Sequence, residues 1–188
     1  MEKDTVKKAG VAIAGFGGQG VLTTGLLLAD AGMKEFEHVS WIPSYSATMR
    51  GGTVACYVIL SNEDIYSPLI SQPEVMIIMD LPSLDTYETS VLPGGALILD
   101  TSMIQREVQR DDIKIIPLPS TDLAKGLGST QVANLVLLGA YLAETKILSM
   151  DAIEATIEST LKESNKEKLI PLNIEALRCG YEKRGMNV

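Results

Sequence analysis

The sequence contains little cysteine and histidine, the side chains that most often bind metals and act as nucleophiles or bases. Among 188 residues there are only Cys56, Cys179 and His38. Two widely separated cysteines cannot form a disulfide framework, and they are too few for a four-ligand zinc or iron–sulfur site. We therefore expect no metal site and no catalytic residue, with both cysteines buried and His38 at the surface.

Long apolar runs are also absent. No stretch of about 18 uninterrupted apolar residues occurs, which is the length that a membrane-spanning helix needs. The first residues, MEKDTVKK, are rich in charge where a signal peptide has an apolar core. These features predict a soluble, cytoplasmic protein with no membrane contact.

Positive charge is scarce in the middle of the chain. Residues 51–113 contain ten acidic side chains against Arg106 and Arg110, and the whole chain has a net charge of −8. An acidic surface repels nucleic-acid phosphates and anionic lipids. We therefore expect neither nucleic acid nor membrane among the partners of this protein.

What the sequence does contain is an alternation of strand and helix patterns. With 46% hydrophobic residues, the chain can bury a core. The predicted strands cover residues 11–14, 39–42, 53–60, 75–79, 96–99 and 113–116, and Pro43 is expected to end the second. The predicted helices cover residues 21–34, 81–92, 131–144, 149–161 and 172–183. The pattern predicts a single α/β domain over residues 1–188, three-layered and Rossmann-like, with a mostly parallel sheet.

A glycine-rich turn joins the first predicted strand to the first predicted helix. Gly15, Gly17 and Gly20 fit the pattern G-x-G-x-x-G in the context that gives this pattern meaning. A helix start offers unpaired N–H groups and a partial positive charge. We therefore predict that an anionic group, such as a phosphate, binds at Gly15, Gly17, Gly18, Gln19 and Gly20. A role of the glycines in strand–helix packing alone remains the alternative.

The dinucleotide interpretation of this turn meets only half of its requirements. An acidic residue at the end of the second strand binds the ribose hydroxyls of NAD in such folds. Here the second strand ends Trp41-Ile42-Pro43-Ser44, without an acid. A free-standing nucleotide-binding or NAD-binding domain, regulatory or oxidoreductase, is therefore the less favoured alternative.

A second polar loop follows the second predicted strand and should lie at the same carboxyl edge of the sheet, where ligands of open α/β sheets bind. Arg50 is its only cation, and a guanidinium suits a phosphate or a carboxylate. The candidate binding residues of this loop are Ser44, Tyr45, Arg50, Gly51 and Gly52.

Four segments together resemble the gamma subunit of 2-oxoacid:ferredoxin oxidoreductases, the pyruvate/ketoisovalerate family, from about residue 10 to residue 181. They are GFGGQG after the first strand, MRGG after the second, NLVLLGA with Asn134, and the closing segment LNIEALRCGY. The short gamma chains of the 2-oxoglutarate-type enzymes are the nearest in pattern. Asn134 lies on an otherwise apolar helix, and we expect its amide to support the first glycine turn.

The resemblance implies a subunit that is inactive alone. Its complex would decarboxylate a 2-oxoacid, with 2-oxoglutarate the leading substrate, pass electrons to ferredoxin and release an acyl-CoA. Thiamine diphosphate and iron–sulfur clusters would belong to partner chains, while this chain would stabilise the assembly and help form the coenzyme A side of the active site. Arg50 and the backbone of residues 17–20 would then hold an anionic part of coenzyme A. The alternatives are that Arg50 pairs with an acid of a partner subunit, or that the chain is purely structural and contacts no ligand.

Overall fold

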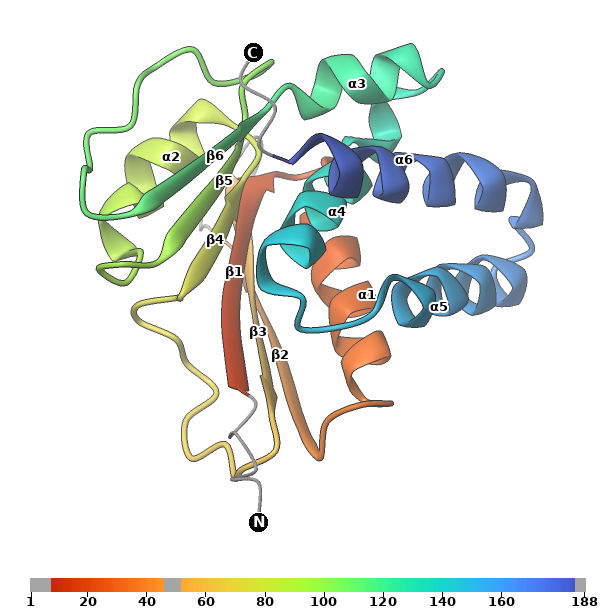
Figure 1. Ribbon diagram of the computed structural model, residues 1–188, viewed down its shortest axis with the longest axis horizontal. Helices are drawn as coiled ribbons and strands as arrows, with labels where there is room; N and C mark the ends of the chain where they lie inside the picture. The colour runs from red at the N-terminus through yellow and green to blue at the C-terminus, as the bar shows by residue number, and fades with distance from the viewer. Residues whose placement is uncertain (1–7, 46–51, 185–188) are drawn as a thin grey trace.

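The computed structural model describes residues 8–45 and 52–184, which form a six-stranded sheet with helices on both faces (Figure 1). The strands are β1 (Lys8–Phe16), β2 (His38–Tyr45), β3 (Thr53–Ser61), β4 (Val75–Ile78), β5 (Ala96–Asp100) and β6 (Lys114–Leu118). Their order across the sheet is β2-β3-β1-β4-β5-β6.

The helices are distributed unequally over the two faces. They are α1 (Val21–Gly32), α2 (Leu81–Tyr87), α3 (Ser120–Gly126), α4 (Ala133–Thr145), α5 (Met150–Glu163) and α6 (Ile170–Lys183), with short 3-10 turns at Glu88–Ser90, Thr130–Val132 and Glu167–Leu169. Figure 1 shows α1, α4, α5 and α6 on one side of the sheet and α2 on the other. The predicted three-layer α/β architecture is confirmed. None of the helices within these ranges is long and apolar enough to cross a membrane.

The sheet is mostly parallel, as predicted. β1, β4, β5 and β6 pair in parallel, whereas β3 pairs antiparallel with both β1 and β2. Five strands therefore point the same way and only β3 opposes them, so β1, α1 and β2 form a β-α-β unit that β3 splits. The carboxyl ends of β1 and β2 consequently lie at the same edge of the sheet.

The expectation that Pro43 ends the second strand was wrong, since β2 continues to Tyr45. Proline has no N–H group to donate and is therefore tolerated in strands that lie at a sheet edge. β2 is such an edge strand. The predicted helix over residues 81–92 was also too long: α2 ends at Tyr87, and the chain continues as a 3-10 turn.

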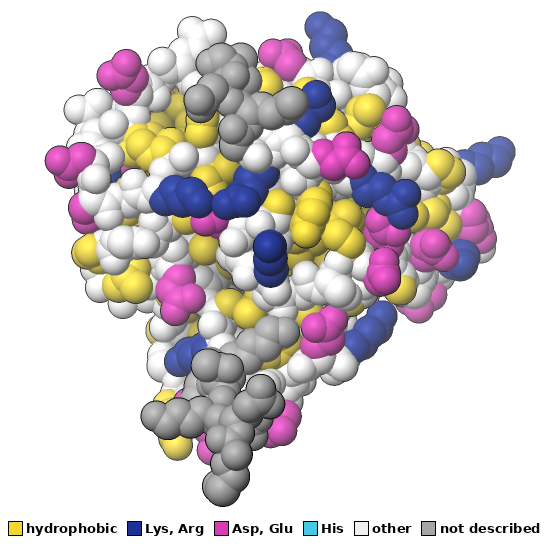
Figure 2. All heavy atoms as spheres, in the orientation of Figure 1, with side chains coloured by type: hydrophobic (Ala, Val, Ile, Leu, Met, Phe, Trp, Pro, Cys, Tyr) yellow, Lys and Arg dark blue, Asp and Glu magenta, His cyan; other side chains and the backbone are white. Residues whose placement is uncertain are grey.

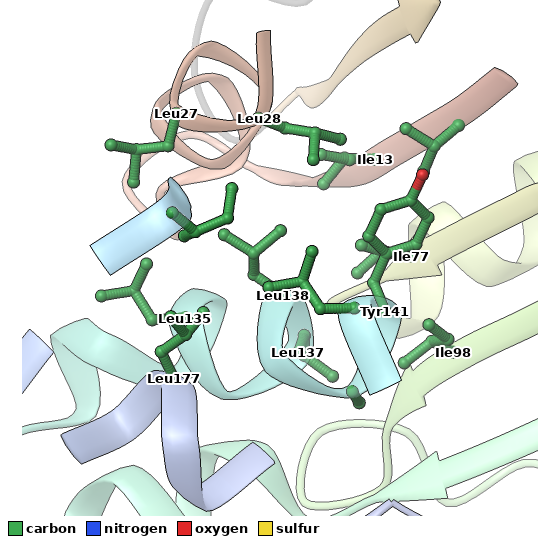
Figure 3. Close-up of a cluster of buried hydrophobic side chains, with 14 of the residues drawn as sticks. Ile13, Leu27, Leu28, Ile77, Ile98, Leu135, Leu137, Leu138, Tyr141 and Leu177 are labelled. Carbon is green, nitrogen blue, oxygen red and sulfur yellow. The ribbon is translucent and has the colours of Figure 1, made fainter. Parts of the chain in front are cut away.

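The core consists of two clusters, one on each face of the sheet. Ile13, Ile77 and Ile98 point to one side, where helices α1, α4 and α6 supply Leu28, Leu138 and Leu177 (Figure 3). Neighbouring strand residues point to the other side and meet α2. The strand residues are Ala12, Met76 and Leu97, and they cluster with Leu84 of α2. Because both faces are covered, the central strands are apolar throughout rather than alternating.

Helices α4 and α6 pack at very close range through two glycines. A Cβ atom on Gly139 would overlap the carbonyl oxygen of Leu177, and a Cβ atom on Gly180 would overlap the carbonyl oxygen of Val136. The absence of side chains at these positions therefore sets the distance between the two helices. This contact positions the first residues of α4, which border the site described below.

The outer surface of the face seen in Figure 1 mixes both signs of charge. Figure 2 shows basic and acidic side chains interspersed with hydrophobic surface on this face. Several charges pair; Glu144, for example, accepts hydrogen bonds from Lys114 and Arg184. Negative charge is therefore not concentrated in a single patch on this face.

Candidate functional site

The glycine-rich turn lies between the end of β1 and the start of α1. Gly18 has φ +106° and Gly20 has φ +80°, a left-handed conformation that glycine adopts without strain. Gly20 is the N-cap residue of α1, and no side chain caps this helix. The first turn of α1 contains no acidic residue. The N–H groups at this helix start are therefore free of competition from a side-chain carboxylate.

Gln19 holds the turn against the sheet. Its carboxamide oxygen accepts a hydrogen bond from the backbone N–H of Phe16 at 2.9 Å, and its carboxamide nitrogen donates to the carbonyl oxygen of Met79 at 3.2 Å. A Cβ atom on Gly15 would lie 2.5 Å from the carboxamide oxygen of Gln19. Gln19 thus links the ends of β1 and β4, and Gly15 leaves the space that this link requires.

Asn134 packs directly against the turn from the first turn of α4. Its side chain is buried and donates from Nδ2 to the hydroxyl oxygen of Thr24 at 3.0 Å. The Thr24 hydroxyl in turn donates to the carbonyl oxygen of Gly20 at 2.9 Å. A Cβ atom on Gly20 would lie 2.6 Å from Asn134 Nδ2. Asn134 and Thr24 therefore fix the position of Gly20 relative to α4.

The end of β2 lies on the same edge of the sheet as this turn. Val54 of β3 pairs with Gly15 on one side and with Tyr45 on the other. With strands about 4.8 Å apart, Tyr45 is roughly 10 Å from Gly15. The Tyr45 side chain is exposed, while Ser44 and Gly52 are half-buried.

Not every predicted residue of the second loop can be placed. Arg50 and Gly51 lie outside the described residues. The placement of β2 also bears on the NAD alternative, because a dinucleotide-binding fold has its second strand next to its first. Here β3 stands between them.

A cavity of about 280 Å³ opens between the carboxyl ends of β1, β4 and β5. After β1 the chain continues toward the β2 edge of the sheet, whereas after β4 it continues toward the β6 edge. The cavity therefore lies at the point where the strand order reverses. Its lining is formed by Phe16, Gly18, Gln19, Met79, Asp100, Met103, Thr121, Thr130, Gln131, Ala133, Asn134 and Leu137. Three of the predicted site residues, Gly18, Gln19 and Asn134, are among them.

Sequence reasoning did not assign Asp100 and Thr121 to the site. Asp100 is the last residue of β5 and is only 1% exposed. One carboxylate oxygen accepts from the hydroxyl of Thr121 at 2.5 Å, and the other accepts from the backbone N–H of Ser102 at 3.0 Å. The signal that could have found it is an aspartate directly at the carboxyl end of a buried strand.

The cysteines and the histidine do not line this cavity. Cys56 is buried in β3, where burial raises the pKa of its thiol to about 12. Cys179 is half-buried on α6, and burial raises its pKa as well. His38 is partly exposed, with Nε2 at 3.5 Å from Oδ1 of Asp64. Within residues 8–45 and 52–184, no three His, Cys, Asp or Glu side chains are grouped so that they could hold a metal ion.

Residues 10–183 match the family model described as pyruvate ferredoxin/flavodoxin oxidoreductase. The chain is 34% identical to the 2-oxoglutarate synthase subunit KorC of Methanothermobacter marburgensis, covering 92% of this chain and 94% of KorC. It is 36% identical to the ketoisovalerate oxidoreductase subunit VorA of the same organism, but it spans only 36% of the length of VorA.

Solved structures have the same fold. The gamma subunit of a keto/oxoacid ferredoxin oxidoreductase from Geobacter sulfurreducens superposes with a TM-score of 0.80 at 26% identity, over 93% of this chain and 97% of that one. The 2-oxoglutarate:ferredoxin oxidoreductase of Magnetococcus marinus has a TM-score of 0.84 at 22% identity, over 94% of this chain and 31% of that one, which shows a shared fold. The chain belongs to the pyruvate ferredoxin/flavodoxin oxidoreductase family.

Proposed function

We propose that this protein is the gamma subunit of a 2-oxoacid:ferredoxin oxidoreductase that acts on 2-oxoglutarate. The complex would decarboxylate the oxoacid oxidatively, transfer the electrons to ferredoxin and release an acyl-CoA. The observation that supports the choice of substrate is the correspondence with KorC over nearly the full length of both chains. The sequence identity to VorA is similar, but this chain matches only about a third of the length of VorA.

The proposal includes a division of labour between chains. Thiamine diphosphate and the iron–sulfur clusters would be bound by partner subunits, which would also reach ferredoxin, and this chain alone would be inactive. Two cysteines in 188 residues cannot supply the four ligands of a cluster, which supports the assignment of clusters to other chains.

The carboxyl edge of the sheet would form the coenzyme A side of the shared active site. In this proposal the backbone of residues 17–20 and the guanidinium of Arg50 hold an anionic part of coenzyme A. The uncapped start of α1, with no acid in its first turn, supports an anion at this position. Tyr45, at the same edge and two strands away, is the last residue of β2.

The role of Arg50 is tested with the Arg50→Lys substitution in the co-purified complex. Lysine keeps the charge but loses the planar two-point hydrogen bonding of the guanidinium. We expect a Michaelis constant for coenzyme A that is raised by about tenfold, which corresponds to the loss of roughly one charge-assisted hydrogen bond. An unchanged constant together with a complex that dissociates more readily would instead assign Arg50 to an ion pair with a partner subunit.

The substrate and the partners are tested separately. The complex, isolated from native extract through this chain, should contain thiamine-binding and cluster-bearing chains in equal amounts. Its kcat/KM should be highest for 2-oxoglutarate among 2-oxoglutarate, pyruvate and 2-oxoisovalerate. A higher value for 2-oxoisovalerate would contradict the assignment of substrate, and turnover by the isolated chain would contradict the subunit role.

A further inference from the structure

We propose that the cavity between β1, β4 and β5 binds an uncharged part of the ligand that bears N–H or O–H donors, and that it excludes phosphate. This inference rests on the proposed function, and it divides coenzyme A into two parts. The phosphates would stay outside, at the glycine turn, and either the pantetheine arm or the adenosine group would enter the cavity. Both groups are uncharged and carry hydrogen-bond donors.

The size of the cavity favours a part of a ligand. Its volume of about 280 Å³ is just below the range of about 300–1,000 Å³ that is typical of small-molecule sites. Half-exposed Phe16 and Met103 and buried Met79 and Leu137 give the lining an apolar component. Such a lining suits the methylene and methyl groups of a pantetheine chain or the ring of a nucleoside.

The charge of the lining argues against a phosphate inside. Among the described residues that line the cavity there is one acid, Asp100, and neither a lysine nor an arginine. Because Asp100 is only 1% exposed, its carboxylate is poorly screened by water. An anion placed in the cavity would meet this carboxylate without a compensating cation.

The hydrogen bonds of Asn134 determine which atom of its carboxamide is available to a ligand. The single hydroxyl proton of Thr24 is donated to the carbonyl oxygen of Gly20, so Thr24 can only accept from Asn134. Asn134 must therefore turn its nitrogen toward Thr24. Its carboxamide oxygen, on a side chain that is only 5% exposed and lines the cavity, has no hydrogen-bond donor among the described residues.

An acceptor on the cavity wall that accepts no hydrogen bond from the described residues favours a ligand that supplies a donor. The carboxyl group of Asp100 adds further acceptor capacity on the same cavity wall. The cavity thus combines acceptors, apolar side chains and no cation. The amide N–H and hydroxyl groups of pantetheine, or the amino and ribose hydroxyl groups of adenosine, match this combination.

The methionines of the lining provide the test. Met79 and Met103 line the cavity, whereas Met33 lies exposed just after α1 and serves as an internal control. The full chain, labelled with ¹³C at the methionine methyl groups, is titrated with pantetheine, adenosine and pyrophosphate and followed by NMR. We expect pantetheine or adenosine to shift the Met79 and Met103 signals with a Kd on the order of 1 mM, as for ligand fragments. Pyrophosphate should leave the Met103 signal in place; Met79 is not used for this comparison, because its carbonyl oxygen accepts a hydrogen bond from Gln19 of the glycine turn.

Two substitutions separate ligand binding from support of the turn. Asn134→Leu removes the carboxamide oxygen and the bond to Thr24, whereas Thr24→Val removes the same bond but keeps the oxygen. We expect Asn134→Leu to weaken binding of the uncharged probe by about tenfold, the effect of roughly one hydrogen bond, and Thr24→Val to weaken it less than threefold.

The inference is overturned if neither uncharged probe shifts Met103, if pyrophosphate shifts it, or if the two variants weaken binding equally. Each of these outcomes leaves the proposed function to be decided by the composition of the isolated complex and by its kcat/KM values. Conversely, an unchanged Michaelis constant in Arg50→Lys would refute the anion contact and would not affect the Met79 and Met103 result. The two failures are therefore distinguishable.

Discussion

The contact between α4 and α6 leads to a strong prediction about stability. Substitution of Gly180 by alanine places a Cβ atom into the carbonyl oxygen of Val136 and 2.9 Å from its Cα atom. These are backbone atoms, so they cannot move aside as the end of a flexible side chain could. The two helices must separate for the methyl group to fit.

The size of the effect is the difference of two terms. Overpacking of a close contact costs about 1–3 kcal/mol, and a backbone overlap belongs at the upper end of this range. Alanine in place of glycine within a helix stabilises the helix by about 1 kcal/mol, which offsets part of this cost. We therefore expect Gly180→Ala to lower the free energy of unfolding by about 2 kcal/mol, and Gly139→Ala to act in the same direction because it meets the backbone of α6 at Leu177.

The assay is urea denaturation followed by far-UV circular dichroism. With a slope of about 2 kcal/mol per M, the midpoint should fall by roughly 1 M. Gly126→Ala is the matched control. Gly126 is the last residue of α3 and has no positive φ, and a Cβ atom added there would have no neighbouring atom within 4 Å among the described residues. Equal midpoints for Gly180→Ala and Gly126→Ala would refute the reasoning about the helix contact.

Two further predictions concern the glycine turn and two buried titratable groups, the Cys56 thiol and the Tyr141 phenol. Gly20→Ala should lower the free energy of unfolding by about 2 kcal/mol in the same assay, since it combines a left-handed φ with the close contact to Asn134, while Gly17→Ala should change it by less than about 0.5 kcal/mol. Burial raises the pKa of Cys56 from 9.0 to about 12 and that of Tyr141 above its usual 10.0, so the unfolded chain loses these protons first as pH rises. Stability should be insensitive to these groups below pH 9.0 and should then fall by about 1.4 kcal/mol per pH unit for each group that ionises only on unfolding. Cys56→Ala removes the thiol, so its free energy of unfolding should fall less steeply above pH 9.0 than that of the parent protein. Equal slopes in the two proteins would contradict the contribution of the thiol.

The prediction of the fold from sequence succeeded where local pattern and burial agree. The apolar runs of β1, β4 and β5 are continuous because helices cover both faces of the sheet. The spacing of Gly15, Gly17 and Gly20 between a strand pattern and a helix pattern is sufficient to identify the turn. In these segments the residue types alone restrict the backbone to very few conformations.

The same reasoning failed where a neighbour in space decides the outcome. Pro43 ends a strand in the interior of a sheet but is tolerated at an edge, and its sequence context does not reveal which applies. The motif around Gln19 does not reveal that its carboxamide bonds to Phe16 and Met79. Asp100 comes from a strand far along the chain and enters the site only because β5 lies two strands from β1.

The amino-acid sequence by itself thus determined the class of fold, the position of the glycine turn and the family to which the chain belongs, because each depends on the order and spacing of residue types. The tertiary structure decided which side chains surround the cavity and which of their atoms remain unpaired. Asn134 illustrates the difference: its burial follows from an apolar helix, but the direction of its carboxamide oxygen follows from a proton that Thr24 gives to Gly20. Such contacts join residues more than a hundred positions apart, and only the folded chain brings them within hydrogen-bonding distance.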